Sequence, residues 1–318
     1  MNALNPRANK ADADPVFETP AFPSNPQPPI ARTPLPGPDE DVRPKHGMAP
    51  GAARYLQGDS LPQTSSVLIS NSQYLNNPYY REAFATQALR RHGPDLPPTY
   101  MVPIMSRALQ ETTDPERVAD LLATEKARLP ALGAWLDARD DFSFRKDDLA
   151  GCAKGTLGQA LFELMSIPGV DMEFSSRENA GLSDLDYLTK RRAYFHDIEH
   201  IVTGFGPNSA GEAALSIMNV TADSRFLTPE LAQTLSAANM WVTATGMYRT
   251  SLHYHHALPT YLDAVQQGIA AGLAVRQPMC LVRWIDFVDW RLDDIADELG
   301  FARGPGAAWD WTTDATNG

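Results

Sequence analysis

Apolar side chains recur at helical spacing through most of the chain beyond residue 75. The segment DPERVADLLATEKARL illustrates the pattern, with apolar positions at Val118, Leu121, Leu122 and Leu129. These positions share one side of a helix with 3.6 residues per turn. Asp114-Pro115 is a favourable helix start, and Pro130 stops the pattern. The segment is therefore predicted to form an amphipathic helix.

Similar patterns predict helices in most of the remaining sequence. A helix should begin near residue 75, where Asn and Pro precede the segment YYREAFATQALRRH and Gly follows it. Further predicted helices are TLGQALFELM, Ser183 to about Thr203, the segment from Ser209, 229–248, 259–273 and 283–299. Few segments alternate with period two, and no repeat at solenoid periods is evident. We predict an all-α protein with a single multi-helix domain over 75–303 and a flexible tail over 304–318.

The N-terminal region has a different composition. Residues 1–50 hold twelve of the 26 prolines. Each proline removes a backbone donor and restrains the residue before it. We therefore predict a disordered Pro-rich arm over 1–60. Such a composition also occurs in segments that bind aromatic grooves, but a linker or tail is the favoured interpretation.

Composition and charge exclude several classes of protein. The chain has 318 residues, of which 43% are hydrophobic and 21% charged, the balance of an ordinary globular protein. The net charge of −12 repels phosphate backbones, so nucleic acid is not expected as a partner. Cys152 and Cys280 form neither a disulfide framework nor a CxxC pair, which fits a reducing compartment and a packing role.

The sequence carries no obvious targeting segment. Its N-terminus has neither a basic stretch leading into an apolar one nor an Arg-rich amphipathic pattern. Charges and prolines interrupt every apolar run before the ~20 residues that a spanning helix needs. We expect a cytoplasmic protein, with any membrane contact peripheral on the inner membrane.

Four potential metal ligands lie close together in the stretch SDLDYLTKRRAYFHDIEHIVTGFGPNSAGEAAL. Ser183 is a candidate N-cap of a helix that runs to Gly204. With ~100° per residue, Asp197 lies ~100° and His200 ~40° from His196, so the three side chains share one sector. Imidazoles one turn apart with a carboxylate between them suit a divalent metal. After the GFGPNS turn, Glu212 can supply a fourth ligand from the next helix.

Two simpler interpretations of these residues stay open. An HxxxH pair on a helix is common by chance. Glu212 also stands three residues after Ser209, so it could belong to an S-x-x-E capping box that only closes the start of the helix.

The same residues resemble a known family. HDxxH followed after eleven residues by Glu is similar to the metal motif of the coenzyme Q biosynthesis protein four family. KGTLGQALFELM resembles the GTLG segment that precedes this motif, and WRLDDIADELGF resembles the terminal segment of the family. The resemblance covers about 150–302. The stretch between Glu212 and Arg276 is longer than in that family.

The resemblance implies an all-helical protein that lies against a membrane and binds a polyprenyl tail near its metal. It implies His196, Asp197, His200 and Glu212 as ligands of zinc, or of another divalent metal such as iron or manganese. The implied activity, in ubiquinone biosynthesis, is oxidative replacement of the carboxyl group on a polyprenylated hydroxybenzoate ring by hydroxyl. We predict His196 and Asp197 as the catalytic residues, and expect a homodimer that meets other quinone-biosynthesis proteins.

Alternatives to this function are a non-catalytic lipid-binding scaffold that organises quinone-biosynthesis enzymes, and a phosphohydrolase with an HD doublet. We predict that His253, His255 and His256 are surface or packing residues, because their spacing does not place all three on one helical face. Arg191 and Arg192 could meet a substrate carboxylate, although at least one should face solvent.

Overall fold

The computed structural model describes residues 72–91, 98–139, 142–170, 172 and 181–313. The predicted arm over 1–60 lies outside these residues. Within them the regular secondary structure is helical, with no β-strand and one isolated bridge between Thr156 and Arg291. The all-α prediction is therefore confirmed.

The N-terminal half consists of short and medium helices. They are α2 (Gln73–Asn76), α3 (Pro78–Leu89), the 3-10 turn η2 (Pro98–Met101), α4 (Val102–Thr112), α5 (Pro115–Arg128), α6 (Pro130–Ala138), α7 (Lys146–Leu149) and α8 (Leu157–Leu164). Several begin at the caps that the sequence offers: Asn77 caps α3 and Asp114 caps α5, each followed by proline.

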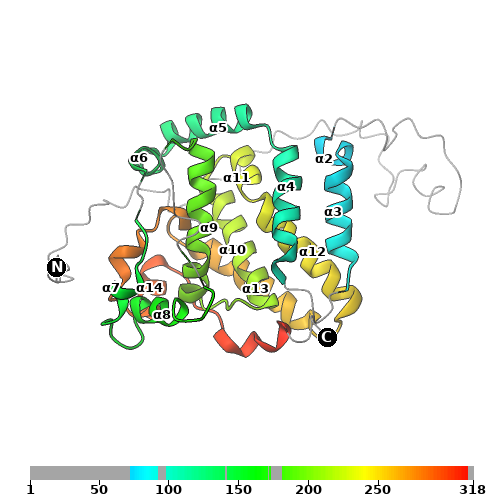
Figure 1. Cartoon of the computed structure of the whole chain (residues 1–318). Coiled ribbons are helices and arrows are strands. Elements are labelled where there is room, and N and C mark those ends of the chain that lie inside the picture. Colours follow the sequence, from blue (N-terminus) through cyan, green and yellow to red (C-terminus); the bar gives the residue numbers. More distant parts are fainter. Residues whose placement is uncertain (1–71, 92–97, 140–141, 171, 173–180, 314–318) are drawn as a thin grey trace, which may run out of the picture.

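The C-terminal half holds the long helices. They are α9 (Asp184–Thr203), α10 (Ser209–Phe226), α11 (Pro229–Leu235), α12 (Ala237–His253), α13 (Leu258–Ala274), η4 (Met279–Leu281), η5 (Trp284–Phe287), α14 (Leu292–Leu299) and η6 (Gly306–Trp309). In Figure 1, α9 and α10 occupy the middle of the molecule, and α3 and α4 lie to one side. No helix in the described ranges is sufficiently long and apolar to cross a membrane.

The core is built around α10. Five of its residues are fully buried: Ala210, Ala213, Ala214, Leu215 and Met218. Its small side chains let α13 pack directly along it, and α12 and α9 contact it as well. A chain of buried apolar residues then joins this centre to α8, α9 and α14. The packing fixes α9 and α10 side by side.

Three sequence predictions need correction. The stretch 229–248 forms two helices, because Ser236 separates them and its hydroxyl donates to Asp223 at 3.1 Å. The stretch 283–299 begins with the 3-10 turn η5, and its α-helix starts only at Leu292.

The third correction concerns the tail predicted over 304–318. Residues 304–313 pack against the fold: Trp309 is buried and stacks on Phe205, with ring centroids 6.1 Å apart. Asp310 accepts a hydrogen bond from Asn208 at 3.1 Å, and Thr312 accepts one from the backbone of Ala210 at 3.3 Å. This polar and aromatic contact with the turn before α10 has no periodic signature in the sequence.

Candidate metal centre

Helix α9 carries two of the candidate ligands. It begins at Ser183, whose hydroxyl accepts a hydrogen bond from the backbone of Asp186 at 3.1 Å, as predicted. It ends at Gly204, whose φ of 68° lies in the left-handed region that glycine adopts without strain. The uninterrupted helix keeps His196 and His200 one turn apart on a rigid frame.

Helix α10 brings the third ligand from the other side of the turn. Its N-cap is Asn208, whose side chain accepts from the backbone of Gly211 at 2.8 Å. The Ser209 amide donates instead to the Thr313 hydroxyl at 3.3 Å. The capping box that we considered for Ser209 and Glu212 is therefore wrong, and Glu212 is free to face α9.

His196, His200 and Glu212 converge at one point. The two Nε2 atoms lie 3.1 Å apart. Glu212 places Oε2 3.5 Å from His196 Nε2 and Oε1 3.3 Å from His200 Nε2. In the described part of the chain, this is the one group of at least three His, Cys, Asp or Glu side chains whose donor atoms converge closely enough for a metal.

The backbone selects one tautomer of His200. Its Nδ1 lies 2.6 Å from the carbonyl oxygen of Phe205, which can only accept. Nδ1 therefore carries the proton, and Nε2 presents a lone pair to the cluster. Such a hydrogen bond to the far ring nitrogen is the usual support of a metal-binding histidine.

The donor set fits a divalent metal. A tetrahedral ion with ligands at about 2.1 Å separates its donor atoms by about 3.4 Å. The three separations of 3.1–3.5 Å agree with that value. His200 is 5% exposed, whereas the side chains of His196 and Glu212 are 40% and 39% exposed. The cluster is thus closed on one side and open to solvent on the other.

Without a metal, the cluster forms an ion pair. Burial opposes the charging of His196, but the hydrogen bond and charge of Glu212 outweigh it and raise the pKa of His196 to about 9. Burial likewise opposes ionisation of Glu212, but its interactions with the two imidazoles, first of all with the charged His196, outweigh it and lower the pKa of that carboxyl well below its usual range. The ionised Glu212 carboxylate therefore strongly favours a positive charge between the two helices, whether on His196 or on a bound metal.

The metal-free protein should therefore lose stability as the pH rises from about 6.5 to about 9. The pKa of His196 is higher in the folded protein than the value of 6.5 in the unfolded chain. Its contribution to the free energy of unfolding is therefore complete below pH 6.5 and is lost as the pH rises to about 9. The contribution of Glu212, whose pKa is lowered, is complete above 4.5 and lost at lower pH. Thermal unfolding in EDTA measures this effect in wild-type protein and Glu212→Gln. The difference between their midpoints should shrink between pH 6.5 and 9, and a constant difference contradicts the ion pair.

The structure does not bring Asp197 into the cluster. Its side chain is exposed, on the solvent side of α9, although its charge still acts on His196. The angle of ~100° that we assigned to it from His196 is wide enough to turn it away from the converging atoms. Its role as a fourth ligand and catalytic residue stays a prediction.

Sequence reasoning missed Glu199. This carboxyl is 5% exposed and accepts a hydrogen bond from the Asn219 side chain of α10 at 2.8 Å. Burial raises its pKa, although Asn219 and the charges of His196, Arg192 and His200 act in the opposite direction. A signal was present, because Glu199 lies ~300° from His196 and so shares the face of the two histidines.

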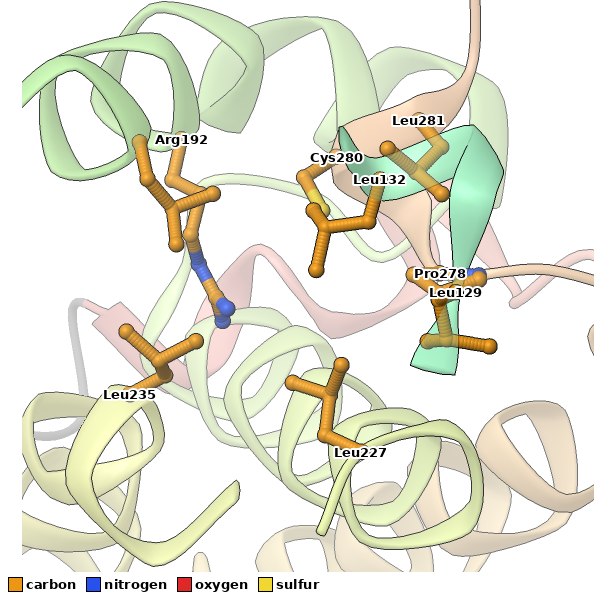
Figure 2. Close-up of a pocket in the computed structure, with 9 residues that line it drawn as sticks. Leu129, Leu132, Arg192, Leu227, Leu235, Pro278, Cys280 and Leu281 are labelled. Atoms are coloured by element: carbon orange, nitrogen blue, oxygen red, sulfur yellow. The ribbon is translucent and has the colours of Figure 1, made fainter. Parts of the chain in front are cut away.

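Arg191 is buried and the side chain of Arg192 is 18% exposed, so neither of the two arginines before His196 lies on an exposed face, as at least one was expected to. Arg191 is 2% exposed and lies over the rings of Tyr194 and Phe195. Arg192 pairs with Asp223 of α10 at 2.8 Å. Figure 2 shows its side chain extending into a small pocket of about 10 Å³ with otherwise apolar walls. The ion pair between Arg192 and Asp223 is therefore a second polar contact between α9 and α10, outside the cluster.

The histidines at positions 253, 255 and 256 are not part of the cluster. His255 and His256 are exposed, and His253 Nε2 hydrogen-bonds to the Leu89 carbonyl at 2.7 Å. His255 and His256 thus lie at the surface, as predicted, and His253 packs on the end of α3.

Comparison with known proteins adds one result on the fold. No family model matches the sequence, and no curated protein matches it. Similar solved structures include a crystal structure at 2.85 Å resolution of a Nostoc punctiforme protein whose name refers to ubiquinone biosynthesis. The TM-score is 0.52, with 22% sequence identity over 70% of this chain and 94% of that one. At this identity the likeness shows a shared fold.

Proposed function

We propose that this chain is a metal-dependent enzyme of ubiquinone biosynthesis that replaces the carboxyl group of a polyprenylated hydroxybenzoate ring by hydroxyl and releases carbon dioxide. The observation that carries the proposal is the convergence of His196, His200 and Glu212 between two helices. The fold shared with a protein named for ubiquinone biosynthesis supports the pathway. The HDxxH-x11-E spacing supports the same family.

The residues would divide the work as follows. His200, buried and held by Phe205, anchors the metal, while His196 and Glu212 complete the triad and leave an open side toward solvent. A divalent ion supplies a Lewis acid for the carboxylate or phenolate of the ring, and iron or manganese, unlike zinc, would add redox capacity. If water supplies the oxygen atom of the new hydroxyl, the substrate loses carbon dioxide and two electrons, and dioxygen would accept these electrons and be reduced to hydrogen peroxide.

The isoprenoid chain needs an apolar surface. A groove of about 520 Å³ lies between α3, α10, α11 and α12. Aromatic side chains dominate one wall, with Tyr80 and Phe84 packed edge-on against Trp241. Grooves of this size and lining suit apolar ligands. We propose it as the site of the polyprenyl tail or another isoprenoid lipid, testable by mass spectrometry of lipid that co-purifies with the protein.

The remaining expectations belong to the same proposal. The enzyme would work in the cytoplasm, peripheral on the inner membrane, as a homodimer beside other quinone-biosynthesis proteins. Size-exclusion chromatography with light scattering measures the oligomeric state directly.

Activity should depend on Glu212. With the substrate labelled at its carboxyl carbon, under oxygen and with iron, manganese or zinc supplied in turn, wild-type protein should release labelled carbon dioxide and form the phenol. Glu212→Gln removes the charge that holds the ion at nearly constant volume, and should lower the rate by more than about 100-fold. Glu298→Gln is the matched control, because it makes the same exchange at an exposed position. It should leave the rate unchanged.

A different result would favour the scaffold. If no metal supports turnover in vitro, and Glu212→Gln still restores quinone synthesis in cells that lack the protein, the chain is a non-catalytic lipid-binding organiser of quinone enzymes.

A further inference from the structure

Polar residues face one another along the contact between α9 and α10. Beyond the cluster, Glu199 accepts from Asn219 at 2.8 Å, and Arg192 pairs with Asp223 at 2.8 Å. Glu199 and Asp223 are 5% and 4% exposed. Buried carboxylates are costly unless a nearby positive charge balances them.

The charges along this contact do not balance. Arg192 and Asp223 neutralise each other as a contact pair. Glu199 hydrogen-bonds to a neutral amide, and the charges that act on it from a distance are those of His196, Arg192 and His200, of which Arg192 is already paired with Asp223. His200 donates through Nδ1 to a carbonyl and so offers a lone pair at Nε2, as a metal ligand must. In the described part of the chain, Asp223 thus has Arg192 as its ion-pair partner, whereas Glu199 has a neutral amide in contact and no paired cation.

A divalent ion in the cluster would reverse that imbalance. Two neutral imidazoles and the Glu212 carboxylate leave one positive charge uncompensated beside the buried side of the site. In a region of low effective dielectric, a unit charge several Å away still contributes substantially to the binding of an ion.

We propose that Glu199 is the counter-charge of the metal centre: a buried carboxylate that raises metal affinity through its charge, without contacting the ion. The inference rests on the proposed function for the existence of the metal. It assigns a role to a residue outside the HDxxH-x11-E pattern. Asn219 then serves to hold the Glu199 carboxylate in place from α10.

A purely structural role makes a different prediction. If Glu199 only joins α9 to α10 through Asn219, its charge is irrelevant and the hydrogen bond alone matters. Glu199→Gln separates the two roles, because its amide oxygen can still accept from Asn219 while the charge is gone. Asn219→Ala is the complementary variant, since it removes the hydrogen bond and keeps the charge.

The experiment measures dissociation constants of Zn²⁺ and Mn²⁺ on the full chain by competition with a chromogenic chelator. Glu199→Gln should weaken both by tenfold or more, with an unfolding midpoint close to that of wild type. Glu199→Asp should recover part of the loss, and Asn219→Ala should weaken binding less than Glu199→Gln does.

The outcomes separate the inference from its premise. Wild-type affinity in a folded Glu199→Gln overturns the counter-charge role and leaves the metal site intact. Weakening in Asn219→Ala that equals or exceeds that in Glu199→Gln also overturns it, in favour of the structural role. A wild-type protein that binds neither Zn²⁺ nor Mn²⁺ overturns the proposed function together with the inference.

Discussion

Replacing His200 with alanine should reduce the bound metal from about one equivalent to nearly none. His200 is the most buried of the three converging residues, and the Phe205 carbonyl fixes its ring so that Nε2 faces the other donors. Without it, His196 and Glu212 form a two-donor site that is open to water and competes poorly with buffer. Elemental analysis of purified wild-type and variant protein measures the change, and activity on the prenylated ring should fall with it.

His253→Ala is the matched control, because this imidazole bonds a helix-terminal carbonyl outside the cluster and should not affect metal content. The substitution at 200 leaves the Phe205 carbonyl without its donor, which costs about 1–3 kcal/mol. Circular dichroism should therefore confirm that the variant is folded before its metal content is interpreted. A folded variant that retains one equivalent would place the metal elsewhere in the protein.

Gly268→Ala should lower the stability of the protein strongly. A β-carbon at this position would lie 2.2 Å from the carbonyl oxygen of Ala214 and 2.6 Å from a methyl group of Ile217. Helices α13 and α10 would have to separate along their contact. Overpacking of this kind costs about 1–3 kcal/mol or more, and because backbone of α10 must move we expect at least about 2 kcal/mol. The gain of about 1 kcal/mol in helix propensity from glycine to alanine only partly offsets it.

Urea unfolding of the metal-free protein measures this change. Gln266→Ala, at an exposed position of the same helix, should change the free energy of unfolding by less than about 0.5 kcal/mol. If Gly268→Ala is as stable as this control, α10 and α13 are not held at the distance that the structure gives them.

The helices were predictable where local signals mark their ends. Asp114 with Pro115 opens α5, and Ser183 and Gly204 delimit α9, because caps and stops act on neighbouring residues. The break at Ser236 was not predictable, since it depends on Asp223, which lies on another helix and thirteen residues away. Long-range contacts of this kind leave no local pattern.

The candidate site was only partly predictable, for a similar reason. Helical angles group His196 with His200, and sequence spacing adds Glu212. The same angles are too coarse to separate Asp197, which is exposed, from Glu199, which is buried. What separates them is the position of α10, and Asn219 marks the side on which it lies. The sequence thus predicts the helix that holds the histidine ligands. It does not predict which of the neighbouring carboxylates lies on the buried side of that helix.

Residues 304–313 contact the turn before α10 through Asp310, Thr312 and Thr313. A nonsense codon just after residue 303 would leave every candidate ligand encoded and every long helix intact. It would nevertheless remove the hydrogen bonds that fasten Asn208, Ser209 and Ala210, four residues or fewer before Glu212. In a genetic screen, late truncations should therefore group with substitutions of the metal ligands rather than with neutral alleles.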